Sequence, residues 1–168
     1  MTLCAAPLPV LRRADFSAAA LTAIVAPYGA RLVEVSPGAR LPGSYWGAPE
    51  AGLAANRLYV RGDTPMHSLL HELGHYVCMT PARRARLWLD AGGDDDEECA
   101  VCYLQLVLAD HVPGFGRARC CDDMDAWGYS FREGSALTWR GGDGADARRW
   151  LLERGLIDAT NRPTWRLR

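Results

Sequence analysis

The order of the expected elements predicts an α+β protein in which a small, mainly antiparallel sheet precedes two core helices. Residues 31–35 and 57–61 alternate between apolar and polar side chains, as strands do. Residues 64–79 and 97–109 carry apolar side chains at helical spacing, as buried helices do. A chain of 168 residues is long enough for one sizeable core, and neither a repeat nor a clear linker divides it. We therefore expect a single domain over residues 1–168.

The flanking segments add shorter elements to this scheme. Residues 15–26 have the spacing of an amphipathic helix, with Asp15 as its N-cap. Tyr45-Trp46 is expected to form a further short strand. After the second core helix, residues 122–132 and 146–154 are expected to be short helices. The second of these ends at Gly155, which is a typical C-cap residue.

The first core helix contains the sequence His71-Glu72-Leu73-Gly74-His75. Positions four apart lie on one helical face, so both imidazoles can bind one metal ion with Glu72 beside them. Catalytic zinc takes such ligands and keeps one position for water, whose proton a carboxylate accepts. Thr64-Pro65 and Thr80-Pro81 are the expected helix ends. The pattern predicts Zn²⁺ bound by His71 and His75, with Glu72 as general base; the alternative is two hydrogen-bonded histidines beside a surface glutamate.

A third ligand is expected from the acidic start of the second core helix, residues 94–98. Glu97 falls on the buried stripe of that helix, and an inward carboxylate is costly unless it meets a cation. Glu97 is therefore the predicted third ligand, and Glu98, on a more polar edge, is the alternative. Asp94, Asp95 and Asp96 are expected to form a solvated N-terminal cap that the helix dipole favours.

An H-E-x-x-H helix followed by a glutamate ligand on a second helix resembles the gluzincin metallopeptidases. The short form, with E-x-x-A and an aromatic residue three positions later, is similar to the ImmA/IrrE-type family; the matching residues are His71, Glu72, His75, Glu97, Ala100 and Tyr103. The resemblance covers about residues 64–109. It implies a zincin-like fold, zinc-dependent cleavage of a peptide or protein substrate, and substrate lying along residues 57–61 at a sheet edge. Gluzincins often hold a zinc histidine with Asp or Asn one turn after the ligand, where this chain has Val101, so another group must orient the imidazole or the register differs.

Three side chains are candidates for stabilising an oxyanion during hydrolysis: Tyr129, His111 and Arg132. His67, one turn before His71, is expected to support the metal site or, more simply, to be a partly buried and hydrogen-bonded histidine. The rival to an enzyme is a non-catalytic, zinc-stabilised binding or regulatory module. Its site would be closed by a fourth protein ligand, for which a cysteine or Glu98 is available.

Composition restricts the partners and the location of the protein. A net charge of −1 provides no general attraction to nucleic acid or to an anionic membrane. The first residues lack the basic start of a secretion signal, and no apolar stretch is long enough to span a membrane. The six cysteines are then expected to be reduced, and the protein cytoplasmic. The sequence gives no indication of oligomeric state.

Overall fold

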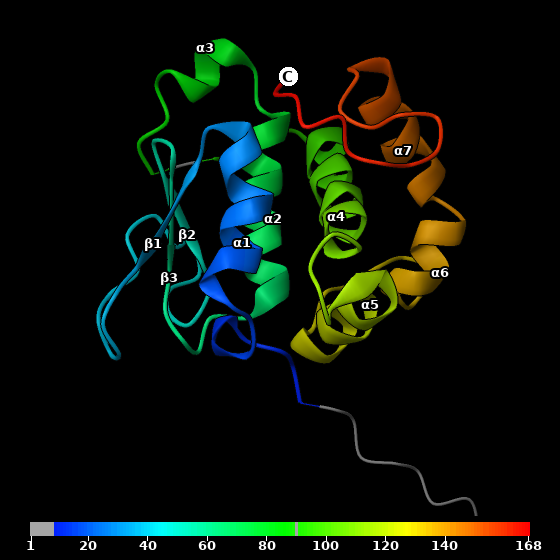
Figure 1. Ribbon diagram of the computed structural model, residues 1–168. Helices are drawn as coiled ribbons and strands as arrows, with labels where there is room; N and C mark the ends of the chain where they lie inside the picture. The colour runs from blue at the N-terminus through cyan, green and yellow to red at the C-terminus, as the bar shows by residue number, and fades with distance from the viewer. Residues whose placement is uncertain (1–8, 90) are drawn as a thin grey trace, which may run out of the picture.

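The computed structural model describes residues 9–89 and 91–168, and it is an α+β structure. Its described residues form seven α-helices, two short 3₁₀ helices and one small mixed sheet (Figure 1). In chain order the α-helices and strands are α1 (Ala18–Val25), β1 (Arg31–Glu34), β2 (Gly52–Ala54), β3 (Arg57–Val60), α2 (Met66–Cys78), α3 (Pro81–Arg84), α4 (Asp95–Ala109), α5 (Gly116–Trp127), α6 (Ala136–Gly141) and α7 (Gly144–Glu153). The 3₁₀ helices are Arg13–Asp15 and Ala26–Tyr28.

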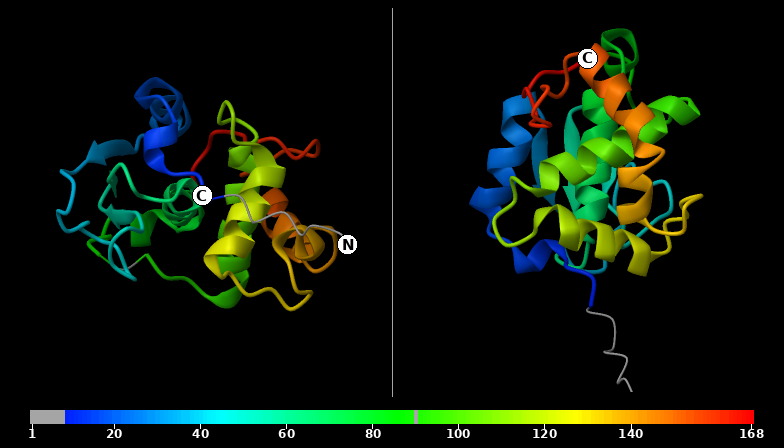
Figure 2. Two further views of the ribbon diagram at one scale, coloured as in Figure 1. Left: turned by 90° about the horizontal axis from the view of Figure 1, so that it is seen from below. Right: turned by 90° about the vertical axis from the view of Figure 1, so that its right-hand side faces the viewer.

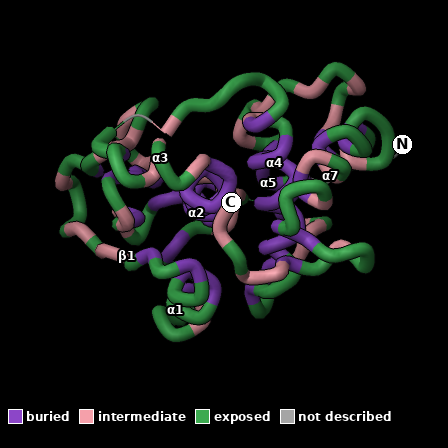
Figure 3. Tube along the Cα trace, turned by 90° about the horizontal axis from the view of Figure 1, so that it is seen from above, coloured by how far each residue is buried: buried purple, intermediate pink, exposed green. Residues whose placement is uncertain are grey.

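Helix α2 occupies the centre of the molecule. The sheet and α1 lie on one side of it and α4 lies on the other (Figures 1 and 2). The other faces of α4 pack against α5 and α7, so α2 and α4 are the two helices with the most buried residues (Figure 3). Both predicted core helices are therefore confirmed, with boundaries within about two residues of those expected.

The sheet differs from the prediction in two respects. Its strand order is β1-β3-β2, with β3 antiparallel to β2 but parallel to β1, so the sheet is mixed and not mainly antiparallel. The third strand is Gly52–Ala54, whereas Tyr45 and Trp46 lie in an exposed loop. A tight turn joins β2 to β3, and this hairpin places β3 between the other two strands. Because β3 is paired along both edges, the expected substrate position along residues 57–61 is wrong.

The loop before β2 covers the outer edge of that strand. The Leu53 amide donates to the Gly43 carbonyl at 3.4 Å, and a Cβ atom at Gly43 would lie 2.2 Å from the Leu53 oxygen. Only glycine permits this approach of the two backbones. Further along, the Ala51 amide donates to Ser68 Oγ at 2.9 Å, and Trp127 Nε1 donates to the Glu50 carboxylate at 2.8 Å. The segment is thus fixed to the sheet, to α2 and to α5.

Two helix starts differ from the sequence prediction in the residue at the N-cap position. Ser17 caps α1 by accepting from the Ala20 amide, so Asp15 is not the cap. At α2, Thr64 Oγ1 accepts from the Arg61 amide, outside the helix, and Pro65 is the N-cap residue. None of the helices in the described part of the chain is both long and apolar enough to cross a membrane.

Candidate metal centre

Gly74 determines how closely the two core helices approach each other. A Cβ atom at this position would lie only 2.9 Å from Cγ1 of Val101 on α4. The absence of a side chain at Gly74 therefore lets α4 cross α2 next to the histidines, and Val101 fills the crossing. The close crossing also brings the first turn of α4 opposite His71 and His75.

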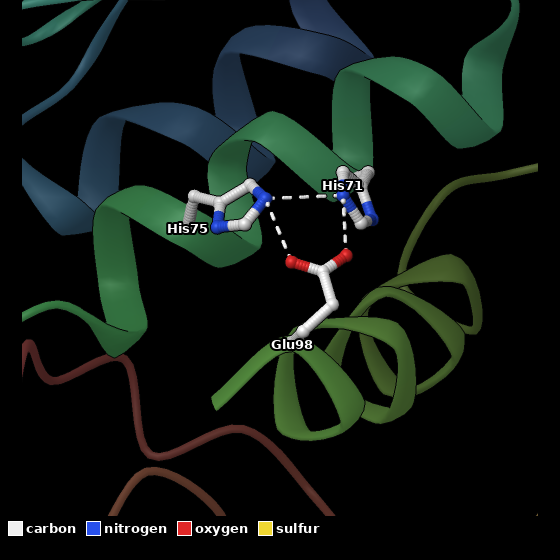
Figure 4. A group of neighbouring side chains, drawn as sticks. All are labelled: His71, His75 and Glu98. Atoms are coloured by element: carbon white, nitrogen blue, oxygen red, sulfur yellow. Dashed lines mark hydrogen bonds and ion pairs between the residues drawn. The ribbon is translucent and has the colours of Figure 1, made fainter. Parts of the chain in front are cut away.

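Three side chains converge at this crossing (Figure 4). The Nε2 atoms of His71 and His75 lie 3.1 Å apart. The Glu98 carboxylate lies 3.2 Å from Nε2 of His71 through one oxygen and 3.4 Å from Nε2 of His75 through the other. In the described residues, His71, His75 and Glu98 form the one group of histidine, cysteine or acidic side chains whose donor atoms come close enough together to hold a metal ion.

The spacing of these donor atoms fits zinc. Tetrahedral zinc with nitrogen and oxygen ligands at its usual bond lengths separates neighbouring ligand atoms by about 3.3 Å. The three observed separations, 3.1, 3.2 and 3.4 Å, bracket that value. Two imidazoles and one carboxylate are also among the ligand sets that zinc takes in enzymes. The donor atoms are therefore already at the separations that a bound zinc requires.

Glu97, the predicted third ligand, lies elsewhere. Its side chain is 4% exposed, and its two carboxylate oxygens accept from Arg83 Nη1 at 2.7 and 2.8 Å. Arg168 Nη1 donates to the same carboxylate at 3.0 Å. The expectation that a buried glutamate must meet a cation was right, but the cations are guanidinium groups and not a metal. The alignment of E-x-x-A with Glu97 and Ala100 therefore does not identify the glutamate that faces the histidines.

Gln105 is a site residue that sequence reasoning missed. It lies on α4 two turns after Glu98 and is fully buried. Its Oε1 is 3.1 Å from His71 Nδ1, and its Nε2 donates to the His67 carbonyl at 3.4 Å. A proton on Nδ1 of His71 can be donated to Oε1 of Gln105. The lone pair on Nε2 of His71 is then left to bind a metal. The available signal was a single amide side chain among the apolar residues of a core helix.

His67 is buried in the core and does not touch the Glu98 carboxylate. Its ring packs against Trp127 and Tyr129, with ring centroids 5.5 Å apart in both pairs. Neither ring nitrogen has a hydrogen-bond partner among the described residues, so the expectation of a hydrogen-bonded histidine is wrong. Burial, aided by the nearby His71, lowers the pKa of His67 to about 3, so the ring is neutral at physiological pH.

The charges at the centre depend on burial and on one another. Burial raises the pKa of Glu72 to about 7; the Glu98 and Glu50 carboxylates add to this effect, while His71 opposes it. Burial also acts to raise the pKa of Glu98, but the hydrogen bond from His71 and the charges of both histidines outweigh it and lower that pKa. Burial acts to lower the pKa of His71, yet its interactions with Cys102 and Glu98 raise it well above its usual value.

A cleft of about 660 Å³ opens onto the three converging side chains. Glu72, the predicted general base, lines this cleft together with His71, His75 and Glu98. Tyr129 also lines it, and its ring centroid is 6.0 Å from that of His71. Burial raises the pKa of the Tyr129 hydroxyl, which therefore stays protonated and able to donate. We refer to this cavity as the metal cleft.

The other two oxyanion candidates lie away from the metal cleft. The His111 ring packs against Trp165, at a centroid distance of 5.4 Å. Arg132 is exposed and paired with Asp143. Of the three candidates, the structure brings Tyr129 alone to the histidines.

Comparisons of this chain with protein-family models, with curated proteins and with solved structures gave no match.

Proposed function

We propose that this chain is a zinc-dependent metallopeptidase with a zincin-like arrangement of its two core helices. The observation that carries the proposal is the spacing of 3.1 to 3.4 Å among two histidine nitrogens and the Glu98 carboxylate, beside Glu72 in an open cleft. Relative to the sequence prediction, His71 and His75 remain as ligands and Glu98 replaces Glu97.

The residues of the cleft divide the chemistry of peptide hydrolysis among them. Zinc, when bound, supplies a Lewis acid that polarises the scissile carbonyl and acidifies water. Glu72 accepts a proton from the attacking water and passes it to the leaving amine nitrogen. The protonated Tyr129 hydroxyl donates to the oxygen that becomes negative when the carbonyl is attacked. Gln105 acts indirectly, because it fixes the orientation and the tautomer of His71.

A catalytic site is favoured over a purely structural one by the composition of the ligand group. A structural zinc site is closed by a fourth protein ligand. Cys102 lies one turn after Glu98 and interacts with His71, yet its sulfur is not part of the group of converging donor atoms. Because the metal cleft opens at this point, a water or a carbonyl oxygen can take the fourth position.

The general-base assignment is tested by Glu72→Gln. We expect this variant to keep one zinc per chain by elemental analysis and to lose about 100- to 10,000-fold in the rate of peptide cleavage. The rate is measured by mass spectrometry on a mixed peptide library, with zinc-loaded wild type alongside. Asp122→Asn, an exposed carboxylate on α5, is the matched control and should cleave at the wild-type rate. Cleavage by Glu72→Gln at the wild-type rate would refute the mechanism.

A further inference from the structure

In the part of the chain that the structure describes, most of the exposed large apolar side chains lie at one place. Among the described residues, the large hydrophobic side chains classed as exposed are Tyr45, Trp46, Trp88, Leu89 and Leu137. Tyr45, Trp46 and Leu89 line the metal cleft, and Trp88 precedes Leu89 in the chain. Exposed apolar groups gathered in this way are typical of binding sites, whereas single ones are ordinary.

The aromatic pair in this cluster is held in place by the loop that carries it. Tyr45 and Trp46 are 80% and 79% exposed and pack edge to face, with ring centroids 5.0 Å apart. Before the pair, Gly43 is bonded to β2; after it, Glu50 is bonded to Trp127, itself a wall of the metal cleft. The segment is fixed at both ends, and it holds two large aromatic rings exposed to solvent in the same cleft as Glu72.

A second cleft, of about 970 Å³, meets the metal cleft at Glu98 and Tyr129, which line both. It runs between α4 and α7, and many of its walls are charged side chains such as Asp96, Arg149 and Glu153. A substrate peptide that crosses the metal centre therefore meets the exposed residues Tyr45, Trp46 and Leu89 on one side. On the other side it meets a cleft in which charged side chains are mixed with aromatic ones such as Trp139 and Trp150.

We propose that Tyr45, Trp46 and Leu89 form a specificity site for a large apolar side chain of the substrate, close to the bond that is cleaved. The proposal rests on the metallopeptidase function proposed above, and it names the class of peptide that the enzyme takes. The rings lose their contact with water when such a side chain lies against them, which favours binding. Small or charged side chains at that position gain no such contact.

The test compares two zinc-binding probes, acetyl-phenylalanine hydroxamate and acetyl-glycine hydroxamate, by calorimetry on zinc-loaded protein. Both carry the same metal-binding group and differ only in the side chain. We expect wild type to bind the phenylalanine probe roughly tenfold more tightly, as expected for partial burial of one aromatic side chain. In the Tyr45→Ala/Trp46→Ala double variant the ratio should fall to near one. Leu137→Ala, an exposed leucine on α6 that lines neither cleft, should keep the wild-type ratio.

The outcomes separate failure of this inference from failure of the proposed function. If neither probe binds wild type, the metal centre is refuted and the specificity site with it. If both bind equally well, the metal centre stands and the apolar site is refuted. If the double variant still prefers the phenylalanine probe, Tyr45 and Trp46 do not form the specificity site. Sedimentation of wild type as a dimer, lost in the double variant, would show that the patch joins two copies of the chain instead.

Discussion

Glu97 and Glu98 are neighbours in the first turn of α4, yet they belong to two different regions of the molecule. Glu97 is buried and bonded to two arginines, Arg83 in α3 and Arg168 after α7. The Glu98 side chain is 47% exposed and faces two histidines across the metal cleft. A step of one residue turns a helix by about 100°, which is enough to send the two carboxylates to opposite partners.

The two carboxylates differ in the charge of the groups that face them. Glu97 receives full positive charges from the chain itself, and its guanidinium partners also tie together distant segments. The partners of Glu98 are imidazoles, which carry a full charge only when they are protonated and are metal ligands when they are neutral. The carboxylate of the first cluster is paired with guanidinium groups, whereas the second is the group that we propose to bind zinc.

The largest effect that separates the two regions is expected in zinc binding. Glu98→Ala removes a ligand and should weaken zinc binding more than the roughly 10- to 100-fold that follows loss of an outer-shell partner. Glu97→Gln should keep the wild-type affinity, since the Glu97 carboxylate is directed at the arginines. Competition with a fluorescent chelator measures both constants, and Asp96→Ala is the control within the same helical turn. Zinc lost from Glu97→Gln but kept by Glu98→Ala would reverse the assignment.

For the free energy of unfolding the order should be reversed, with loss of Glu97 costing more than loss of Glu98. Glu97→Ala leaves the guanidinium groups of Arg83 and Arg168 without their carboxylate and should lower the free energy of unfolding by about 3 kcal/mol. This is the lower end of the range for breaking a buried ion pair, because the Arg83 and Arg168 side chains are 33% and 28% exposed and solvent screens them. Urea unfolding of the zinc-free proteins measures the change, and Glu98→Ala is the comparison. A loss no larger than that of Glu98→Ala would contradict the structural role of Glu97.

The smallest expected effect concerns His67, the histidine of α2 that faces the core. With its pKa lowered to about 3, the ring stays neutral in the folded protein, whereas the unfolded chain takes up a proton below about pH 6.5. The unfolded state then binds more protons, so stability falls as the pH is lowered from 6.5 towards 3, by at most about 1.4 kcal/mol per pH unit from this group. His67→Met removes the contribution.

This pH dependence is measured by urea unfolding of zinc-free wild type and His67→Met at pH 7.5 and 5.5. Between these values wild type should lose about 1 kcal/mol more than the variant, because the carboxylates titrate in both proteins and cancel in the difference. Equal losses would show that His67 accepts a proton in the folded state, and that the contrast between a core histidine and the two site histidines does not hold.

The sequence by itself determined the positions of the two core helices and of the strands β1 and β3. Helical periodicity located α2 and α4, and the spacing of His71 and His75 placed both imidazoles on one face of α2. These features depend on contacts between residues three or four positions apart, which a linear pattern records directly. The same pattern also indicated that Glu97 is buried and must meet a cation.

Only the tertiary structure decided which glutamate faces the histidines and which strand lies at the sheet edge. The first depended on the crossing of α2 and α4 at Gly74 and Val101, and on the presence of Arg168 beside Glu97, 71 positions further along the chain. The second depended on β1 pairing in parallel with β3 across more than twenty residues. Burial alone cannot distinguish a guanidinium from a metal ion as the partner of a carboxylate. That choice is made by segments far apart in sequence, whose positions are fixed only when the core packs.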